Sequence, residues 1–292
     1  MIDVPCVSVV ITTHNRCKLL KRAIGSVLAQ TYKNIELIVV NDASSDDTAD
    51  YCSSAKIRCI NIPLEESRGG NHARNIGIHH ASGKYVAFLD DDDYWLSEKL
   101  TKQVALLEET GAGVCHCPRR NEIVNKNGDV EYYNQSLTST FEGNLNKRIL
   151  YQISIITSAL VVRRNLLNEI GRFDENLKFW QEYDLSIRLA QKTDFVMVNE
   201  PLYVYRINMH DPSRLTNKYF GWTESVKYIY RKYGQLYNGL SRHEKLKYNI
   251  LVTTDAIGRA QASGLGFQFM YNRLKLKFLT ILESILWKNT TI

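Results

Sequence analysis

The chain has 292 residues, of which 44% are apolar or aromatic and 23% are charged, so it can fill a hydrophobic core and is neither a disordered nor a fibrous protein. No apolar run approaches the ~20 residues that a helix needs to cross a bilayer. The net charge of +6 is unevenly distributed, because residues 214–292 contain 13 Lys or Arg against 4 Asp or Glu, a balance of +9, which leaves −3 for residues 1–213.

Apolar runs and helical patterns alternate along the first part of the chain. Strands are predicted at residues 7–12, 35–40, 57–62 and 85–89, and helices at about 19–28 and 70–81. Because these strands are apolar throughout, the pattern favours a parallel sheet that is covered by helices on both faces. The carboxyl ends of the strands would then line one crevice, where open α/β sheets bind their ligands.

The fourth strand runs directly into four consecutive carboxylates, Asp90, Asp91, Asp92 and Asp93. Clustered acids raise one another's pKa values and cost stability unless a cation compensates them. Hard ions such as Mg²⁺ or Mn²⁺ bind carboxylate oxygens together with those of a phosphate, so this stretch predicts a site for a metal ion and a nucleoside diphosphate. The alternative is an acidic loop that caps the next helix, for which one Asp would be enough.

Other polar residues follow strands at the same expected edge of the sheet. Residues 12–15 come after the first strand and Asp42 after the second, and the loop at residues 67–77 adds Arg68 and Arg74 beside glycines that allow close approach to the backbone. Each feature alone is weak, since such residues often cap helices or face solvent. Their coincidence at one edge predicts a nucleotide site.

These segments together, VSVVITTHNR, QTYKNIELIVVNDASSDDT, the Gly and Ala-Arg-Asn loop and YVAFLDDDDYW, resemble the large family 2 glycosyltransferases of the GT-A fold over about residues 6–210. The resemblance implies a Rossmann-like, mostly parallel sheet flanked by helices, and metal-dependent, inverting transfer of a sugar from a UDP-sugar. It implies that Asp42 hydrogen-bonds the uracil, that Asp91 faces the ribose and that Asp92 holds Mn²⁺ or Mg²⁺, while Asp90 fits either role. The other residues that it suggests for the donor site are Thr12, His14, Asn15, Arg68 and Arg74.

The second half of the chain holds the acids expected on the acceptor side. The family has a Gly-x-Phe-Asp-Glu turn, here residues 171–175, ahead of acids that open a helix. An inverting transfer needs a base beside the acceptor hydroxyl, and comparison with the family pattern places Glu182 there. Asp184 would point about 200° away on a helix and is interpreted as the rival base or as a structural acid on the acceptor side. A further alternative is that both acids only decorate the helix start.

Two more positions complete the predicted site, each with an ordinary alternative. Trp180 suits an acceptor sugar, although a core tryptophan is equally ordinary. His210 is predicted as a further contact to the metal ion or diphosphate, with Arg206 and Arg214 as alternative diphosphate partners; His210 could instead simply be exposed.

Residues 216–292 are predicted to form a basic helical extension to a catalytic domain at residues 1–215, in which residues 1–95 bind the nucleotide and residues 96–215 the acceptor. One stripe in this extension is apolar and lies between basic residues: Leu274, Phe278, Ile281, Leu282 and Ile285. Peripheral contact of residues 265–292 with an anionic membrane is one interpretation, which a lipid-linked saccharide acceptor would favour. Packing against the catalytic domain or a twin subunit is the more ordinary one.

Composition and motifs also bear on compartment and on other function classes. The six cysteines lie within the first 117 residues without Cys-x-x-Cys spacing, and Cys115 and Cys117 are interpreted as buried thiols in a reduced, cytoplasmic protein. The first residues lack a basic leader and a cleavage site, so no signal peptide is expected. A nucleotidyltransferase would carry a Gly-rich basic loop after the first strand, and a non-catalytic sugar-nucleotide module would lack Glu182. Nucleic-acid binding would depend on the basic tail alone, so no such partner is expected.

Overall fold

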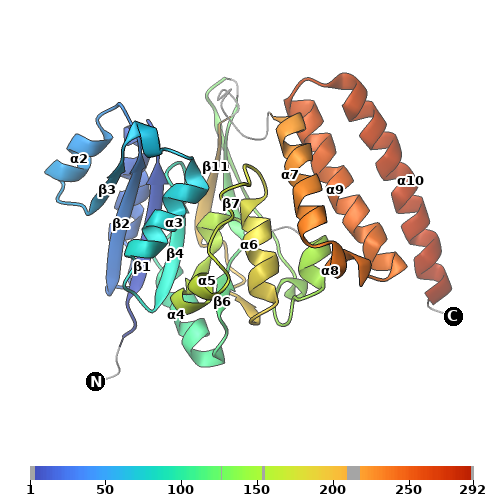
Figure 1. Cartoon of the computed structure of the whole chain (residues 1–292), viewed down its shortest axis with the longest axis horizontal. Coiled ribbons are helices and arrows are strands. Elements are labelled where there is room, and N and C mark those ends of the chain that lie inside the picture. The colour runs from blue at the N-terminus through green and yellow to red at the C-terminus, as the bar shows by residue number, and fades with distance from the viewer. Residues whose placement is uncertain (1–3, 126, 153–154, 209–217, 291–292) are drawn as a thin grey trace. The chain divides into compact units, whose positions relative to one another are not determined.

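The computed structural model describes residues 4–125, 127–152, 155–208 and 218–290 (Figure 1). The chain divides into two compact units. Unit 1 comprises Met1–Leu145, Ile155–Asn176 and Asp184–His210, and unit 2 comprises Asn146–Ser154, Leu177–Tyr183 and Asp211–Ile292.

Unit 1 contains a seven-stranded sheet in the order β10-β6-β9-β4-β1-β2-β3. Its strands are β1 (Val7–Thr13), β2 (Ile35–Asp42), β3 (Cys59–Ile62), β4 (Tyr85–Asp90), β6 (Val114–His116), β9 (Val161–Arg163) and β10 (Phe195–Met197). Every pair in this sheet is parallel except those of β9, which runs antiparallel to both β4 and β6. The predicted mostly parallel sheet is therefore confirmed, and the reversed strand is an addition to it.

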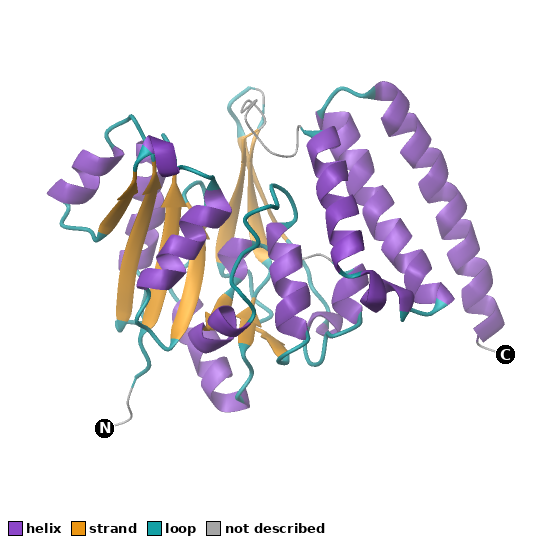
Figure 2. Cartoon of the chain, viewed as in Figure 1, coloured by secondary structure: helices purple, strands orange, loops and turns teal. Residues whose placement is uncertain are grey.

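Alternating side chains of β1 face opposite sides of the sheet, as strand geometry requires. Val9 and Ile11 belong to one buried cluster with Leu20 and Ile24 of α1 (Cys17–Leu28). Val10 faces α3 (Gly70–His80), because a Cβ added at Gly77 would lie 2.3 Å from its side chain. Figure 2 shows helices on both sides of the strands, and this double cover explains why the strands are apolar throughout.

Within the residues that the structure describes, unit 1 also contains four other helices. They are α2 (Thr48–Ser54), α4 (Lys99–Thr110), α5 (Arg164–Glu169) and most of α6 (Gln181–Ala190), with short 3₁₀ turns at Leu64–Glu66, Ser139–Phe141 and Thr157–Ala159. The six cysteines are free thiols, and Cys115 and Cys117 are buried as predicted.

A second, four-stranded sheet has the order β5-β11-β7-β8, with β5 at Tyr94–Trp95, β7 at Arg119–Val124, β8 at Val130–Asn134 and β11 at Tyr203–Asn208. Strands β7 and β8 form the hairpin that Asn127-Gly128 predicts, and Gly128 adopts φ +89°, which favours glycine. Strand β5 begins directly after Asp93, so Asp91–Asp93 form the turn between β4 and β5 and connect the two sheets.

Unit 2 is helical, with α7 (Tyr219–Lys232), α8 (Gly234–Asn238), α9 (Arg242–Ala262) and α10 (Gly266–Thr290). Helix α9 lies beside both α7 and α10 (Figure 1). The helical character predicted for residues 216–292 is confirmed, but unit 2 also includes two segments from the predicted acceptor half, one of them the 3₁₀ turn Arg148–Tyr151. None of the helices in the described ranges combines the length and the apolarity that crossing a membrane requires.

Candidate functional site

Strands β2, β1 and β4 end side by side, because β1 pairs in parallel register with both neighbours. Thr12 lies opposite Val40 on one side and Asp90 on the other. The polar segments after these three strands therefore meet at one edge of the sheet, as the sequence predicts.

The four aspartates after β4 occupy four different environments. Asp90 accepts a hydrogen bond from the buried Arg74 guanidinium at 2.6 Å. Asp93 is fully buried, accepts from Ser158 Oγ at 2.6 Å and from the backbone N–H of Arg206 at 3.1 Å, and thereby fastens the turn to β11. Burial, followed by the charges of the other aspartates, raises the pKa of Asp93.

The two middle aspartates share a cation that the predicted site does not include. The Arg16 guanidinium lies 3.2 Å from Asp91 Oδ1 and 3.2 Å from Asp92 Oδ2. Asp91 is buried and accepts from Thr13 Oγ1 at 2.8 Å, and burial, followed by the charge of Asp92, raises its pKa to about 6. The Asp92 side chain is 37% exposed, so its carboxylate is the more open of the two.

The backbone of the aspartate turn is held by a second buried network. Arg22 of α1 donates to the carbonyl oxygen of Asp92 at 2.7 Å and to Glu122 of β7 at 3.1 Å. Glu122 also accepts from Arg206 Nε at 3.1 Å and from Tyr94 at 3.1 Å. Arg22 and Glu122 thus tie the turn to the second sheet.

Asp42, at the end of β2, has a buried carboxylate oxygen without a hydrogen-bond partner among the described residues. The residue is 6% exposed, and its backbone carbonyl accepts a hydrogen bond from His14 Nδ1. A buried acceptor left unsatisfied costs about 1–3 kcal/mol. A ligand N–H that reached this oxygen would recover that cost.

The loops beside Asp42 are held in a fixed shape. Asn15 adopts φ +54° and accepts from the backbone N–H of Ser45 at 2.7 Å, while its own N–H donates to Ser44 Oγ at 2.9 Å. Ala43 also lies in the left-handed region, at φ +55°. Such conformations cost energy unless surrounding contacts impose them. Asn15 therefore fixes this loop both through its side-chain oxygen and through its backbone N–H.

The two predicted arginines differ in position. Arg68 is exposed in the loop before α3, whereas Arg74 is 8% exposed and lies over the ring of Phe173 at 5.6 Å from its centroid. The turn at residues 171–175 is anchored on α3, since Asn75 donates to the Phe173 carbonyl at 2.9 Å and Asn71 to that of Asp174 at 2.9 Å. Arg74 is thus placed as an internal support of Asp90.

The predicted acceptor residues fall at the start of α6. Glu182 is half-buried and belongs to unit 2, whereas Asp184 belongs to unit 1, is fully buried and pairs with Arg188 at 2.6 Å. The structural role for Asp184 thus has a physical basis. Trp180 is 5% exposed and its indole N–H donates to Asp255 at 2.9 Å, with Trp222 packed edge-on against its ring. Trp180 therefore packs in the core of unit 2, and its contact with an acceptor sugar stays a prediction.

No side-chain group of three or more His, Cys, Asp or Glu is assembled for a metal ion within the ranges that the structure describes. His210 and Arg214 lie outside those ranges. Arg206 is described, and its guanidinium is engaged with Glu122 in the network under the aspartate turn.

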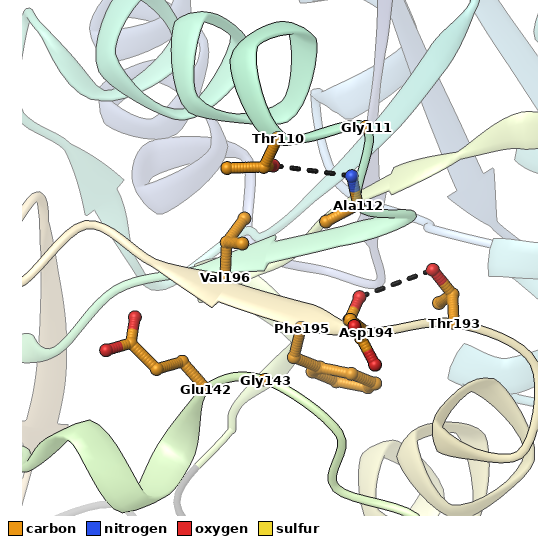
Figure 3. A pocket seen from close by; sticks show the side chains of 9 residues that line it. All are labelled: Thr110, Gly111, Ala112, Glu142, Gly143, Thr193, Asp194, Phe195 and Val196. Atoms are coloured by element: carbon orange, nitrogen blue, oxygen red, sulfur yellow. Dashed lines mark hydrogen bonds between the residues drawn. The ribbon is translucent and has the colours of Figure 1, made fainter.

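A hollow of about 420 Å³ lies elsewhere in unit 1, at the β10 edge of the large sheet (Figure 3). Its lining includes Thr110, Glu142, Asp194 and Phe195. None of the predicted site residues lines it, and the candidate site remains the β1, β2 and β4 edge.

Sequence reasoning does not predict four residues that hold the aspartates in place: Arg16, Arg22, Glu122 and Ser158. Arg16 stands directly after the Thr-Thr-His-Asn segment, so its position was a usable signal. The other three come from a helix face, a hairpin and a 3₁₀ turn, and only the fold brings them to the turn.

Comparisons with known proteins agree with this geometry. A model of glycosyl transferase family 2 matches residues 8–171. An uncharacterized glycosyltransferase of Rickettsia felis is 32% identical over 203 residues, 69% of this chain and 33% of that protein, so the chain spans about a third of that relative's length. The amylovoran biosynthesis glycosyltransferase AmsB of Erwinia amylovora is 36% identical over 235 residues, 76% of this chain and 74% of AmsB.

One further relative and two solved structures are informative. The Escherichia coli protein WfaP, named a UDP-Glc:alpha-D-GlcNAc-diphosphoundecaprenol beta-1,3-glucosyltransferase, is 41% identical over 103 residues, 35% of this chain and 41% of WfaP. S. aureus TarS 1-349 in complex with UDP-GlcNAc has a TM-score of 0.57 and 18% identity, over 97% of this chain and 92% of that chain. The mannosyltransferase PcManGT from Pyrobaculum calidifontis, in complex with GDP-Man and Mn²⁺, has a TM-score of 0.64 and 15% identity, over 93% and 87%.

The two structures share the fold alone with this chain at those identities, and that fold is GT-A. The family model covers more than half of the sequence, including β2, β4 and all of β1 except Val7. The chain belongs to glycosyl transferase family 2.

Proposed function

We propose that this chain transfers a sugar from a UDP-sugar to a saccharide acceptor, with inversion at the anomeric carbon and with a divalent metal ion. The observation that carries the proposal is the unpartnered buried oxygen of Asp42 at the sheet edge where the aspartate turn also lies. An imide N–H such as that of uracil would satisfy this oxygen. The UDP-GlcNAc complex of TarS, which shares the fold, supports a uridine donor.

The donor set around Asp92 fits a hard divalent ion. Its carboxylate is 37% exposed, and sites for Mg²⁺ use one or two carboxylates together with substrate phosphates in preference to a cage of protein ligands. Asp92 would hold Mn²⁺ or Mg²⁺ beside the diphosphate, sharing its charge with Arg16. When bound, the ion neutralises the charge that develops on the departing diphosphate. The Mn²⁺ complex of PcManGT supports this choice.

The remaining roles fall to residues of this chain. Asp42 orients the uracil and Asp91 binds the ribose. His14 and Asn15, which contact the Asp42 carbonyl and the Ser45 backbone, shape the loop next to them. Glu182 takes the proton of the acceptor hydroxyl while that oxygen bonds to the anomeric carbon and the bond from carbon to the diphosphate oxygen breaks, so the electron pair leaves with UDP. The role of Glu182 rests on its position in the family pattern.

We infer that the acceptor is a saccharide on a lipid diphosphate carrier. The name of WfaP, which includes diphosphoundecaprenol, supports this class, as does the role of AmsB in the biosynthesis of a polysaccharide. The reaction would then take place at the inner face of the cell membrane, where the UDP-sugar and the carrier meet.

A panel of nucleotide sugars, assayed for Mn²⁺-dependent release of UDP with and without EDTA, tests the reaction. We expect Asp92→Asn to abolish the Mn²⁺-dependent release of UDP. We expect Glu182→Gln to lower kcat by about 10²–10⁴-fold, the usual contribution of a general base. Glu182→Gln should leave the Kd for UDP, measured by isothermal titration, unchanged. Asp50→Asn, an exposed residue of α2, is the matched control.

Other outcomes would identify other functions. Release of pyrophosphate in place of UDP would identify a nucleotidyltransferase. Tight UDP binding without turnover against any acceptor would identify a binding module. Unchanged kcat in Glu182→Gln would overturn its role as base.

A further inference from the structure

Helix α10 exposes a continuous row of large apolar side chains. They are Phe267, Tyr271, Leu274, Phe278, Ile281 and Ile285, which are 79%, 58%, 66%, 62%, 50% and 50% exposed. We call these six residues the α10 row. Exposed apolar side chains are ordinary when they stand singly, but a contiguous set marks an interaction site.

The spacing places the whole row on one side of the helix. Successive members are 4, 3, 4, 3 and 4 residues apart, which keeps them aligned in a straight stripe. The first and last members are 18 residues apart, or about 27 Å at ~1.5 Å per residue.

The opposite side of α10 is already packed, so the row is not an internal face of the helix. Asn272 and Leu279 are 5% and 8% exposed, and α10 lies along α9. The Asn272 amide donates to the Tyr219 hydroxyl of α7 at 3.2 Å and to the Gln268 carbonyl of its own helix at 2.7 Å. These contacts fix the rotation of α10 and direct the row outward.

The charges beside the row decide between possible occupants. Arg273, Lys275 and Lys277 are exposed and lie between Tyr271 and Phe278 in the sequence. The only acid in the sequence of α10 is Glu283. A second copy of the chain seated on the row would bring two such sets of cations together, which like charges oppose. Nucleic acid would be attracted by the cations but would not bury the apolar side chains of the row. An anionic lipid surface satisfies both features, since acyl chains receive the apolar side chains and headgroups the cations.

We propose that α10 docks the chain on an anionic membrane surface, with the α10 row inserted at the boundary between headgroups and acyl chains. Arg273, Lys275 and Lys277 contact the anionic headgroups. The aromatic rings of Phe267, Tyr271 and Phe278 suit this depth, because such rings favour the interface. This proposal goes beyond the transfer reaction and does not depend on it.

Flotation of the full chain with vesicles of phosphatidylcholine that contain ~30% phosphatidylglycerol tests the proposal. The chain should float with these vesicles and should float far less with phosphatidylcholine alone or at high salt. The double variant Leu274→Gln with Phe278→Gln should lower the partition coefficient by about 100-fold, given the transfer free energy of two large apolar side chains. The double variant Lys275→Gln with Lys277→Gln should lower it by about fivefold for each charge removed.

Matched controls come from unit 1. Leu64→Gln and Lys18→Gln change residues that are exposed in the same way but lie outside unit 2, and neither should alter flotation. Metal-dependent UDP release without vesicles should be unchanged in all of these variants, which separates a failure of docking from a failure of the transfer reaction.

Three results would overturn the proposal. The first is absence of flotation with anionic vesicles. The second is equal flotation of the wild type and the Leu274→Gln, Phe278→Gln variant. The third is a dimer, measured by light scattering, that does not float and that this variant dissociates, because the row would then bind a second copy.

Discussion

Lys99 is a basic residue in a fully buried position of unit 1. It opens α4, its ammonium donates to Gln103 Oε1 at 2.6 Å and it lies 4.2 Å from the centroid of the Trp95 ring. Burial lowers its pKa to about 8, against smaller opposite effects of Cys117 and Cys115. Because this pKa is lowered, the folded chain binds fewer protons than the unfolded chain between pH 8 and ~10.4, and stability rises with pH in that window.

Lys99→Met should reveal this dependence. At pH 7 both states of the wild type are protonated, so the cost of burying the ammonium is fully present, and it is relieved as the pH passes the folded pKa. We expect the unfolding free energy of the wild type, relative to Lys99→Met, to rise by about 3 kcal/mol between pH 7 and pH 10.5. Urea denaturation at several pH values measures it. A difference that stays constant with pH would contradict a titrating buried lysine, and Lys18→Met is the exposed control.

Glu122 is the acid under the aspartate turn. Burial alone would raise its pKa, but hydrogen bonds and charge from Arg22, with Tyr94 and Tyr132, lower it overall. Because the folded pKa is lowered, this network stabilises the fold above the unfolded pKa of ~4.3, and the contribution disappears as the pH falls through the folded pKa.

Glu122→Gln should therefore destabilise the fold by about 2 kcal/mol at pH 7, because it leaves Arg22 and Arg206 partly buried without their anion. The difference in unfolding free energy should shrink as the pH falls below the unfolded pKa of ~4.3 and through the lower folded pKa. Since Arg22 also holds the Asp92 carbonyl, the apparent affinity for Mn²⁺ in the UDP release assay should fall more than kcat at saturating metal. Glu131→Gln on the neighbouring strand changes an exposed acid and should do neither. An effect on stability without any effect on metal affinity would limit Glu122 to a structural role.

At the scale of elements, α3 approaches β1 more closely than a side chain at Gly77 would permit. An added Cβ would lie 2.3 Å from Val10 Cγ1 and 3.0 Å from Cγ2. This close packing places the start of α3, with Arg74, beside the end of β4.

Gly77→Ala should lower the unfolding free energy by about 1–3 kcal/mol, because overpacking outweighs the gain in helix propensity. Gly25→Ala in α1 meets nothing within 4 Å, so the same change there should stabilise by about 0.5–1 kcal/mol. Val10→Ala removes the methyl groups that the new Cβ would meet. The loss of unfolding free energy in the double variant should therefore be smaller than the sum of the losses in Gly77→Ala and Val10→Ala. Additive costs would show that the two side chains do not meet.

The elements that the sequence predicts best are those with local signals. The four apolar strands, the hairpin at Asn127-Gly128 and the helical tail all follow from patterns within a few residues. Asp93 does not, because its partners Ser158 and Arg206 lie 65 and 113 residues away and no local pattern indicates them. All four aspartates look alike in sequence, and only the fold separates a buried anchor from an open carboxylate.

The boundary predicted at residue 215 also depends on contacts between distant segments, which local sequence does not reveal. Sequence composition changes there, because the tail is basic and helical. Residues 177–183 nevertheless join unit 2, where Tyr183 donates to the Leu150 carbonyl and pairs with Tyr237. These contacts link segments that are far apart along the chain, which a change in composition does not reveal.

For the whole molecule, the two units predict a localised response to the donor. Every donor residue that we propose lies in unit 1. UDP with Mn²⁺ at 100 times Kd should stabilise the folded state by about 2.7 kcal/mol. We expect slower hydrogen exchange in β1, β2 and β4, with little change in α9 and α10, and loss of the effect with EDTA. An equal rise in protection over both units would contradict a donor response confined to unit 1.

The reversed direction of β9 has a further consequence for variation in this family. Because β9 runs against β4, the chain just before β9 arrives next to the last residue of β4, and Ser158 donates to Asp93 there. The excursion that connects β8 to this point has to return to one spot, but nothing at the acid turn dictates its path or length. Changes in the length of that segment away from its own contacts, such as the pairing of Gly143 with Phe195 and the hydrogen bond from Tyr183 to the Leu150 carbonyl, should therefore leave the contact between Ser158 and Asp93 unchanged.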